Sequence, residues 1–241
     1  APEKVAGMRS LLLNIRRFVC DQMIPDAYTI ADYYKEYFEI GQGYGNLLTF
    51  GCFNGYEKLG TLYVDPLESG SGRITKLDPG EITENVYSSW YTAKSETDTP
   101  YQAVPEPDRK KSGAYSWVKA PRYRGLPYEV GPLARMWLCG QYRHGISSMD
   151  RTLARVLEAR KIADILLVLL ENVIPGVCIQ KEYEVPQSAR GAGLIDTTRG
   201  ALGHWIKIEN RVLSLYQIIT PSAWNLSTRG PDNLPGPGEK A

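Results

Sequence analysis

One stretch of the sequence, DTTRGALGHW at 196–205, places an arginine in a setting that suits ligand binding. Arg199 follows the glycine-rich segment 189–194 and is followed directly by Gly200. Glycine allows a backbone to come close to a ligand, and a guanidinium offers five N–H donors in a fixed fork. The pattern fits a buried anionic ligand. It also fits the commoner case of an arginine that a carboxylate or carbonyl groups satisfy.

The other reactive side chains show no catalytic or metal-binding spacing. The two histidines, His144 and His204, are far apart and have no second ligand four residues away, so we expect each to make a structural hydrogen bond. Three serines lack the strand–turn–helix context of a hydrolase nucleophile, and three carboxylates form no recognisable acid–base pair. These residues are Ser147, Ser148, Ser188, Glu182, Glu184 and Asp196. The sequence GQGYG at 41–45 follows a predicted helix rather than a strand, which favours a turn over a phosphate loop.

Four cysteines, Cys20, Cys52, Cys139 and Cys178, are isolated from one another. No two have CxxC spacing, so the chain lacks a local zinc or iron–sulfur motif. Four cysteines could form disulfides, but the sequence is neither short nor typical of a domain whose loops are held together by disulfides. Reduced and mostly buried thiols are the favoured interpretation.

The composition is that of an ordinary globular protein, with 43% hydrophobic and 23% charged residues. A chain of 241 residues corresponds to one or two domains, and we expect a single domain over 1–241. The net charge of +1 gives no general attraction to nucleic acid or to an acidic membrane. No apolar run approaches the roughly 18 residues of a transmembrane helix. The chain begins APEKV, which is typical of an interior cut, a processed end or a recombinant product.

The amino-terminal part predicts two helices. Apolar residues recur every three to four positions over 8–19 and form one stripe. Proline disfavours helical geometry in the residue before it, so Pro25 is expected to end this helix. An aromatic-rich second helix is expected over 26–40. The stripe consists of Met8, Leu11, Leu12, Ile15, Phe18 and Val19.

The strongest helical pattern runs over 150–174, with Asp150 as the N-cap. From 165 to 170 the sequence ILLVLL is apolar on all sides, which indicates burial at the centre of a larger body.

Strands are predicted in two parts of the chain. Short strands are expected over 46–53 and 60–66, and period-two alternation over 204–219 predicts a hairpin with its turn at Glu209 and Asn210. Three segments are irregular: a polar loop at 92–113, a packed segment at 115–136 and a loop-like tail at 229–241. Together these patterns predict an α+β fold with a mainly helical core, long buried helices and a small antiparallel hairpin or sheet.

Several long segments resemble the catalytic large subunit of nickel–iron hydrogenases. In that family an acidic-Ala-Pro-Arg-Gly turn precedes Ala-Leu-x-His-Trp, a hairpin and Pro-Ser/Thr-x-Trp-Asn, and residues 196–225 show the same order, with PSAWN at 221–225. The segments YSWVKAPRYRGLPYEVGPLAR at 115–135 and IPDAYTIADYYKEYFEIGQGYGNLLTFG at 24–51 are also similar. The resemblance covers nearly the whole chain in the right order.

The resemblance implies a site for a nickel–iron centre whose iron carries carbon monoxide and cyanide. By this resemblance Arg199 is the catalytic residue: it donates hydrogen bonds to one cyanide and lies over the open coordination site, where it stabilises charge or takes a proton. Ser222 would donate to the other cyanide, and the Thr197 backbone and the Pro221 ring would complete the cofactor-binding pocket. The implied reaction is the reversible heterolytic cleavage of H2 into protons and electrons. The implied partner is a small subunit whose iron–sulfur clusters take the electrons.

The sequence departs from the family pattern at several points. Asp196 stands where the family usually has glutamate, and Thr198 stands where it has proline. More importantly, the family binds its metals through two CxxC pairs near the ends of the subunit, and this chain has neither. The resemblance therefore assigns no metal ligand here, and it places the proton-relaying glutamate outside the chain.

Three explanations of the missing ligands stay open at this stage. The chain is part of a full subunit, one piece of a split subunit completed by other chains, or a degenerate relative that has lost its metals. In the third case it would be a non-catalytic structural or interaction subunit, and a hydrogen sensor with the same fold is a further alternative. The compartment also stays open between cytoplasmic, membrane-associated and exported, because a partner subunit can carry the export signal or the membrane anchor.

Overall fold

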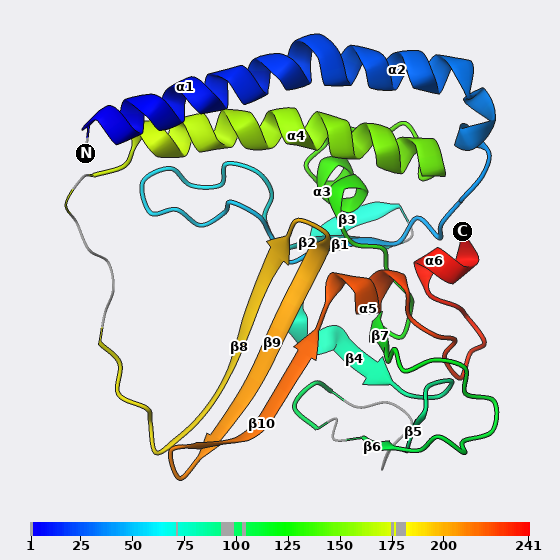
Figure 1. The fold of residues 1–241 in the computed structure, drawn as a ribbon. Helices are drawn as coiled ribbons and strands as arrows, with labels where there is room; N and C mark the ends of the chain where they lie inside the picture. Colours follow the sequence, from blue (N-terminus) through cyan, green and yellow to red (C-terminus); the bar gives the residue numbers. More distant parts are fainter. Residues whose placement is uncertain (1, 71, 93–98, 103–104, 175, 177–181) are drawn as a thin grey trace.

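The computed structural model describes residues 2–70, 72–92, 99–102, 105–174, 176 and 182–241. A layer of long helices lies on one side of the molecule, and small sheets and loops lie on the other (Figure 1). An α+β fold is therefore confirmed, but a mainly helical core is not, since 35% of the structure is helical. No helix among the described residues is long and apolar enough to cross a membrane.

The first helical segment does not stop at Pro25. Helix α1 (Pro2–Phe18) continues through a π-helical turn (Val19–Met23) into α2 (Ile24–Tyr33). The Ile24 N–H bonds the carbonyl of Val19, five residues back, and this wider spacing accommodates a proline at the start of the next helical segment. The predicted second helix is shorter than expected, because α2 ends at Tyr33 and a 3₁₀ turn (Lys35–Phe38) follows.

Helix α4 (Ser148–Glu171) lies antiparallel to α1. Ion pairs join Arg9 to Glu171 at 3.9 Å and Arg16 to Asp164 at 2.5 Å, which fixes this direction. The N-cap of α4 is Ser147 rather than Asp150. Its hydroxyl accepts from the Asp150 N–H, and the Asp150 carboxylate accepts from the Ser147 N–H, so the two residues form a capping box.

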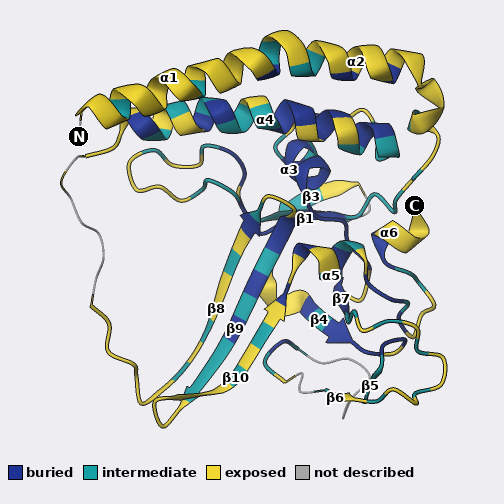
Figure 2. Ribbon diagram, viewed as in Figure 1, coloured by how far each residue is buried: buried dark blue, intermediate teal, exposed yellow. Residues whose placement is uncertain are grey.

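The predicted central burial of 165–170 is only partly correct. Ile165 and Leu170 are buried, but Leu166 and Val168 are exposed. Helix α1 has no buried residue, so its apolar stripe is not part of this chain's own core (Figure 2). Apolar side chains of the two helices instead line an open groove of about 370 Å³, here called the α1–α4 groove. Its residues are Met8, Leu11, Leu12, Leu166, Leu169, Leu170 and Val173.

The first sheet differs from the predicted strands. It has the order β1–β2–β3 and is antiparallel, with strands β1 (Leu47–Thr49), β2 (Leu67–Gly70) and β3 (Arg73–Lys76). The prediction over 46–53 is therefore confirmed only in its first half, at Leu47–Thr49. The prediction over 60–66 is wrong, because that segment contributes only isolated bridges, such as the one between Cys52 and Val64.

The carboxy-terminal hairpin is confirmed and is one strand larger than predicted. Strands β8 (Ser188–Thr197), β9 (Gly200–Glu209) and β10 (Val212–Ile219) form an antiparallel sheet with β9 in the middle. The turn between β9 and β10 lies at Asn210 and Arg211, one residue later than predicted, and their φ values of 53° and 64° are those that a type I′ turn requires. The sequence did not predict β8.

The irregular segments carry short elements. Strand β4 (Ile82–Asn85) pairs with β7 (Ala120–Tyr123), and β5 (Tyr91–Thr92) pairs with β6 (Glu106–Pro107). A 3₁₀ turn (Pro79–Glu81) precedes β4, and β7 is followed by α3 (Pro132–Leu138). Helix α5 (Pro221–Asn225) follows the carboxy-terminal sheet, and the predicted loop-like tail 229–241 contains one short helix, α6 (Pro237–Lys240). Part of the predicted loop at 92–113 lies outside the described residues. The predicted packed segment 115–136 is largely buried from Ala120 onward, as expected.

Two clusters of buried side chains form the core. One lies between α3, α4 and the first sheet and includes Leu47, Leu133 and Leu153. The other lies between β4, β7, β9 and α5 and includes Trp205 and Trp224. The β8–β9 turn reaches the boundary between the helical layer and these sheets (Figure 1).

Candidate functional site

The turn between β8 and β9 carries Arg199. Thr197 pairs with Gly200, and the Thr197 hydroxyl donates to the Gly200 carbonyl at 3.1 Å. Gly200 has φ +130°, and a Cβ built on it would lie 2.7 Å from the backbone nitrogen of Gly131. Gly131 has φ +122°, and its own Cβ would lie 2.9 Å from the Arg199 carbonyl oxygen. Two glycines therefore allow this turn to pack backbone against backbone at the start of α3.

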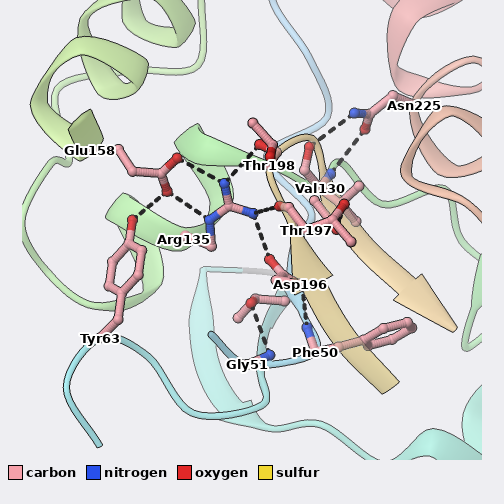
Figure 3. A network of polar contacts seen from close by, with 12 residues as sticks. Phe50, Gly51, Tyr63, Val130, Arg135, Glu158, Asp196, Thr197, Thr198 and Asn225 are labelled. Atoms are coloured by element: carbon pink, nitrogen blue, oxygen red, sulfur yellow. Dashed lines mark hydrogen bonds and ion pairs between the residues drawn. The ribbon is translucent and has the colours of Figure 1, made fainter. Parts of the chain in front are cut away.

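A buried arginine, Arg135 of α3, holds the other side of the turn (Figure 3). Its Nη1 donates to the Asp196 carboxylate and to the Thr197 carbonyl, both at 2.9 Å. Its Nη2 donates to the Thr198 carbonyl at 3.1 Å. Nε and Nη2 donate to the two oxygens of Glu158 in α4, at 2.7 and 2.8 Å. All five N–H donors of the guanidinium are thus used.

Both carboxylates beside Arg135 are buried and have further donors. The Asp196 Oδ1 accepts from the Phe50 N–H at 2.9 Å, and the Tyr63 hydroxyl donates to Glu158 at 2.6 Å. Burial raises the pKa of Asp196, and Arg135 opposes that rise. Burial acts against the charge of Arg135, but the hydrogen bonds and charge of Glu158 outweigh it and raise the pKa of the guanidinium. Burial and the neighbouring Glu158 also raise the pKa of Tyr63.

Helix α5 lies beside the turn and is fixed by its neighbours. The Thr220 side chain caps the helix by accepting from the Ala223 N–H at 3.2 Å. Pro221 is buried at the first position, and Ser222 is exposed. The Asn225 amide exchanges two hydrogen bonds with the backbone of Val130, at 3.0 and 2.9 Å (Figure 3). This bidentate contact ties α5 to the segment just before Gly131.

Three of the four predicted site residues line one cleft. Arg199, Pro221 and Ser222 contribute to a cavity of about 350 Å³ between the turn, α5 and α4. Arg151 and Arg155 of α4 also line it. The fourth, Thr197, does not line the cavity, and its hydroxyl is engaged within the turn.

The cleft is rich in positive charge. Arg151 is paired with Glu129, with Nε–Oε1 at 2.7 Å and Nη2–Oε2 at 2.9 Å. Arg199 and Arg155 are exposed and, among the described residues, neither side chain has an ion-pair partner. The cleft is therefore lined by two arginines that have no ion-pair partner among the described residues, which suits an anionic ligand.

The remaining candidates lie elsewhere. The His204 Nδ1 is 2.7 Å from the Tyr216 hydroxyl across β9 and β10, and the His144 Nδ1 is 2.8 Å from Asp150. Both contacts agree with the predicted structural roles. Cys20, Cys52 and Cys139 are free thiols, but they are half-buried rather than mostly buried as expected. Cys178 lies outside the described residues.

A metal-ligand cluster is not found in the part of the chain that the structure describes: no group of three or more His, Cys, Asp or Glu side chains could hold an ion there. Burial raises the pKa of Cys52 to about 11 and also raises that of Cys139. At both positions burial favours the neutral thiol over the thiolate.

The sequence did not reveal Arg135, Glu158 or Asn225. Their partners lie far away along the chain: Arg135 contacts residues 23 and 61 positions later. One signal was present. Arg135 is a lone charge within the apolar stretch PLARMWL, and such a residue must find buried partners.

The sequence and the fold match one class of protein. The sequence profile of the nickel-dependent hydrogenase family matches residues 1–145 and 138–241, which together span the whole chain. The chain therefore belongs to the nickel-dependent hydrogenase family.

Its relatives within that family are large subunits. The chain is 31% identical to the periplasmic [NiFeSe] hydrogenase large subunit of Desulfomicrobium baculatum, over 99% of this chain and 51% of that protein. It is 29% identical to the hydrogenase-1 large chain of Escherichia coli, over 99% of this chain and 50% of that protein. A solved structure of the reduced, active Ni-Fe-Se hydrogenase from Desulfomicrobium baculatum superposes with a TM-score of 0.91 and 30% identity, over 98% of this chain and 53% of that one. The chain thus spans about half the length of these relatives.

Proposed function

We propose that this chain forms part of the active site of a nickel–iron hydrogenase large subunit, which catalyses the reversible heterolytic cleavage of H2 into protons and electrons. The observation that carries the proposal is the convergence of Arg199, Pro221 and Ser222 on one cleft. These residues lie on two separate elements, the β8–β9 turn and α5. Their convergence requires the fold and does not follow from their spacing in the sequence.

The residues present fit the surroundings of a nickel–iron centre with carbon monoxide and cyanide ligands. Cyanide is an anionic acceptor, and the free guanidinium of Arg199 and the exposed hydroxyl of Ser222 are donors on the wall of the cleft. Pro221 adds a buried apolar wall. Arg199 would hold one cyanide and Ser222 the other, and the backbone at Thr197 would close the pocket.

The same residues do not supply the metal ligands. No group of three or more potential ligand side chains is found among the described residues, and the sequence has no CxxC pair. The two CxxC pairs would therefore come from polypeptide outside these 241 residues, in the same subunit or in another chain. When bound, the centre would supply the site at which H2 is polarised and split.

The role of the chain's own residues is orientation and charge stabilisation. Arg199 is held in the cleft by a turn whose backbone is fixed on both sides. Donors that are fixed before the reaction stabilise developing charge without reorganisation, which makes them effective catalysts.

The partner that we propose is a small subunit with iron–sulfur clusters, which accepts the electrons. The uncovered apolar groove between α1 and α4 supports the need for further polypeptide, because a contiguous exposed apolar surface marks an interaction site. Two of its residues, Met8 and Leu11, are 54% and 64% exposed.

One observation favours a second candidate function. Because no CxxC pair is present, a non-catalytic structural or interaction subunit with the same fold would account for the chain without metals. A hydrogen sensor would keep the same cleft, so the cleft residues do not separate it from the enzyme.

Metal analysis with infrared spectroscopy of the complete complex tests the proposal. We expect stoichiometric nickel together with stretching bands of cyanide and carbon monoxide. A complex that contains all its chains but lacks nickel and these bands would exclude the enzyme and support the structural subunit. Metal-loaded complex without turnover in an H2-dependent dye-reduction assay would support the sensor.

Arg199→Lys gives a sharper test of the proposed catalytic residue. Lysine keeps the positive charge but replaces the fixed fork by a flexible point charge. We expect turnover to fall about 10²–10³-fold, as for the loss of one fixed donor, while nickel content stays unchanged. Arg155→Lys is the matched control, because it changes an arginine of the same cleft for which the proposal assigns no cyanide contact. Wild-type turnover in Arg199→Lys would remove Arg199 from the mechanism.

A further inference from the structure

The buried side chain of Arg135 holds the β8–β9 turn, although Arg135 does not line the cleft. We infer that Arg135 is a positioning residue, which sets the place of the Arg199 guanidinium in the cleft by holding the two peptide carbonyls before it. This inference rests on the proposed function, since it concerns how the proposed catalytic residue is oriented.

The contacts of Arg135 bear directly on the turn. Two of its five hydrogen bonds go to the carbonyls of Thr197 and Thr198, at 2.9 and 3.1 Å, and Thr198 is the residue before Arg199. On the other side, the backbone of Gly200 packs against Gly131. The turn is therefore clamped from two directions, and neither clamp uses the side chain of Arg199 itself.

The remaining bonds of Arg135 hold the clamp rigid. Glu158 accepts from Nε and Nη2 in the bidentate geometry that fixes the plane of a guanidinium. The Arg135 side chain is only 2% exposed, so water does not compete for these donors. With its plane fixed from α4, the guanidinium can direct the remaining donors only toward Asp196 and the two carbonyls (Figure 3).

A lysine cannot reproduce this arrangement. An ammonium has three donors on a flexible stem, whereas the four groups around Arg135 lie on two elements and need a planar fork. Arg135→Lys would keep the charge that Glu158 and Asp196 require and would release at least one turn carbonyl. The variant therefore separates positioning of the turn from neutralisation of the buried carboxylates.

The purely structural alternative is that Arg135 only stabilises the fold. It predicts that any variant that weakens the network lowers the thermal midpoint and leaves the position of the Arg199 guanidinium unchanged. Tyr63→Phe is the matched control for this alternative. The Tyr63 hydroxyl donates to Glu158 Oε1 at 2.6 Å, and among the described residues it has no hydrogen bond to the turn.

The experiment compares wild type, Arg135→Lys, Tyr63→Phe and Arg199→Lys in the full large subunit assembled with its partner. Four quantities are measured for each: nickel content, the cyanide stretching frequencies, kcat with KM for H2, and the thermal midpoint. For Arg135→Lys we expect shifted or broadened cyanide bands and a kcat about 10²-fold lower, because a displacement of about 1 Å has such an effect, at unchanged nickel content. For Tyr63→Phe we expect a lower thermal midpoint with wild-type bands and kcat.

The outcomes separate this inference from the proposed function. If Arg135→Lys keeps wild-type bands and kcat while Arg199→Lys changes both, the positioning role is overturned and the proposed function stands. If Tyr63→Phe shifts the bands as much as Arg135→Lys, the effect is structural and the inference again fails. If the wild-type complex shows no cyanide bands, the proposed function and this inference fall together.

A second variant keeps the inference testable if Arg135→Lys does not assemble. Glu158→Gln preserves the shape of the side chain but has only one acceptor oxygen. In the wild type, Nε and Nη2 of Arg135 donate to two oxygens of Glu158. The Arg135 plane is then held by fewer bonds, and we expect a band shift in the same direction as for Arg199→Lys but smaller. Unchanged bands in an assembled Glu158→Gln complex would overturn the inference.

Discussion

The β8–β9 turn and the α1–α4 groove differ in how many of their contacts this chain supplies itself. At the turn, a buried guanidinium has a partner for each of its donors, and two glycines close the contact on the other side. At the groove, seven apolar residues line an open surface, and helix α1 has no buried residue. Contacts within this chain therefore fix the backbone of the turn, but they leave the apolar stripe of α1 uncovered.

This difference follows from the kind of interaction in each region. Hydrogen bonds need particular partners at particular angles, so the polar network must be complete where it is buried. Apolar contact is not directional, and any complementary apolar surface can supply it. Further polypeptide can thus cover the groove later without altering the geometry of the turn. The two regions predict opposite sensitivities to mutation.

The largest effect is expected where the buried network loses its only positive charge. Arg135→Met would leave Glu158 and Asp196 buried without a counter-charge, and we expect the free energy of unfolding to fall by about 3–5 kcal/mol. Urea unfolding followed by circular dichroism measures the change. The double variant Arg135→Met/Glu158→Leu should recover part of the loss, because it also removes the Glu158 carboxylate that the single variant leaves buried without a counter-charge. A loss below about 1 kcal/mol for the single variant would mean that water reaches the network.

A smaller effect is expected where the backbones of the turn and α3 touch. Gly200→Ala would place a Cβ 2.7 Å from the Gly131 nitrogen at a φ of +130°, so we expect a loss of about 1–3 kcal/mol. Gly193→Ala in β8 is the matched control, because its Cβ would have no atom within 4 Å and no positive φ is required. The same unfolding measurement should separate the two variants. Equal losses would show that the close approach at Gly200 is not specific.

The two regions also differ in what the sequence could predict. The β9–β10 hairpin was predictable, since alternating residues and a turn at Asn210 are local signals. Strand β8 was not, because its sequence SARGAGLIDT is rich in glycine and alanine and lacks apolar alternation. The continuation of the helix past Pro25 depended on a π-helical turn, which no simple periodicity signals.

The candidate site shows the same limit more clearly. Arg199, Pro221 and Ser222 were identified by resemblance to a family, and spacing alone left Arg199 as a plausible anion clamp. Arg135 was missed because its partners are distant along the chain and meet it only in the folded protein. The apolar stripe of α1 was recognised as a pattern, but the sequence did not reveal that no residue of α1 is buried within this chain. A pattern shows that a face must be covered and cannot show which polypeptide covers it.

The smallest effect is expected in the groove, and it gives the strictest test of the comparison. Leu11→Gln changes a residue that is 64% exposed, so we expect the free energy of unfolding of this 241-residue chain to change by less than about 0.5 kcal/mol. Fluorescence of a dye that binds exposed apolar surface should nevertheless decrease, because the groove becomes more polar. Leu153→Ala on the inner face of α4 is the control: that residue is 3% exposed, and its truncation should cost about 2–5 kcal/mol. In the assembled complex, by contrast, Leu11→Gln should become clearly destabilising if further polypeptide covers the groove. If the Leu11→Gln complex has the same thermal midpoint as the wild-type complex, the groove stays open in the assembly. The groove would then not need further polypeptide, and the contrast with the turn would no longer hold.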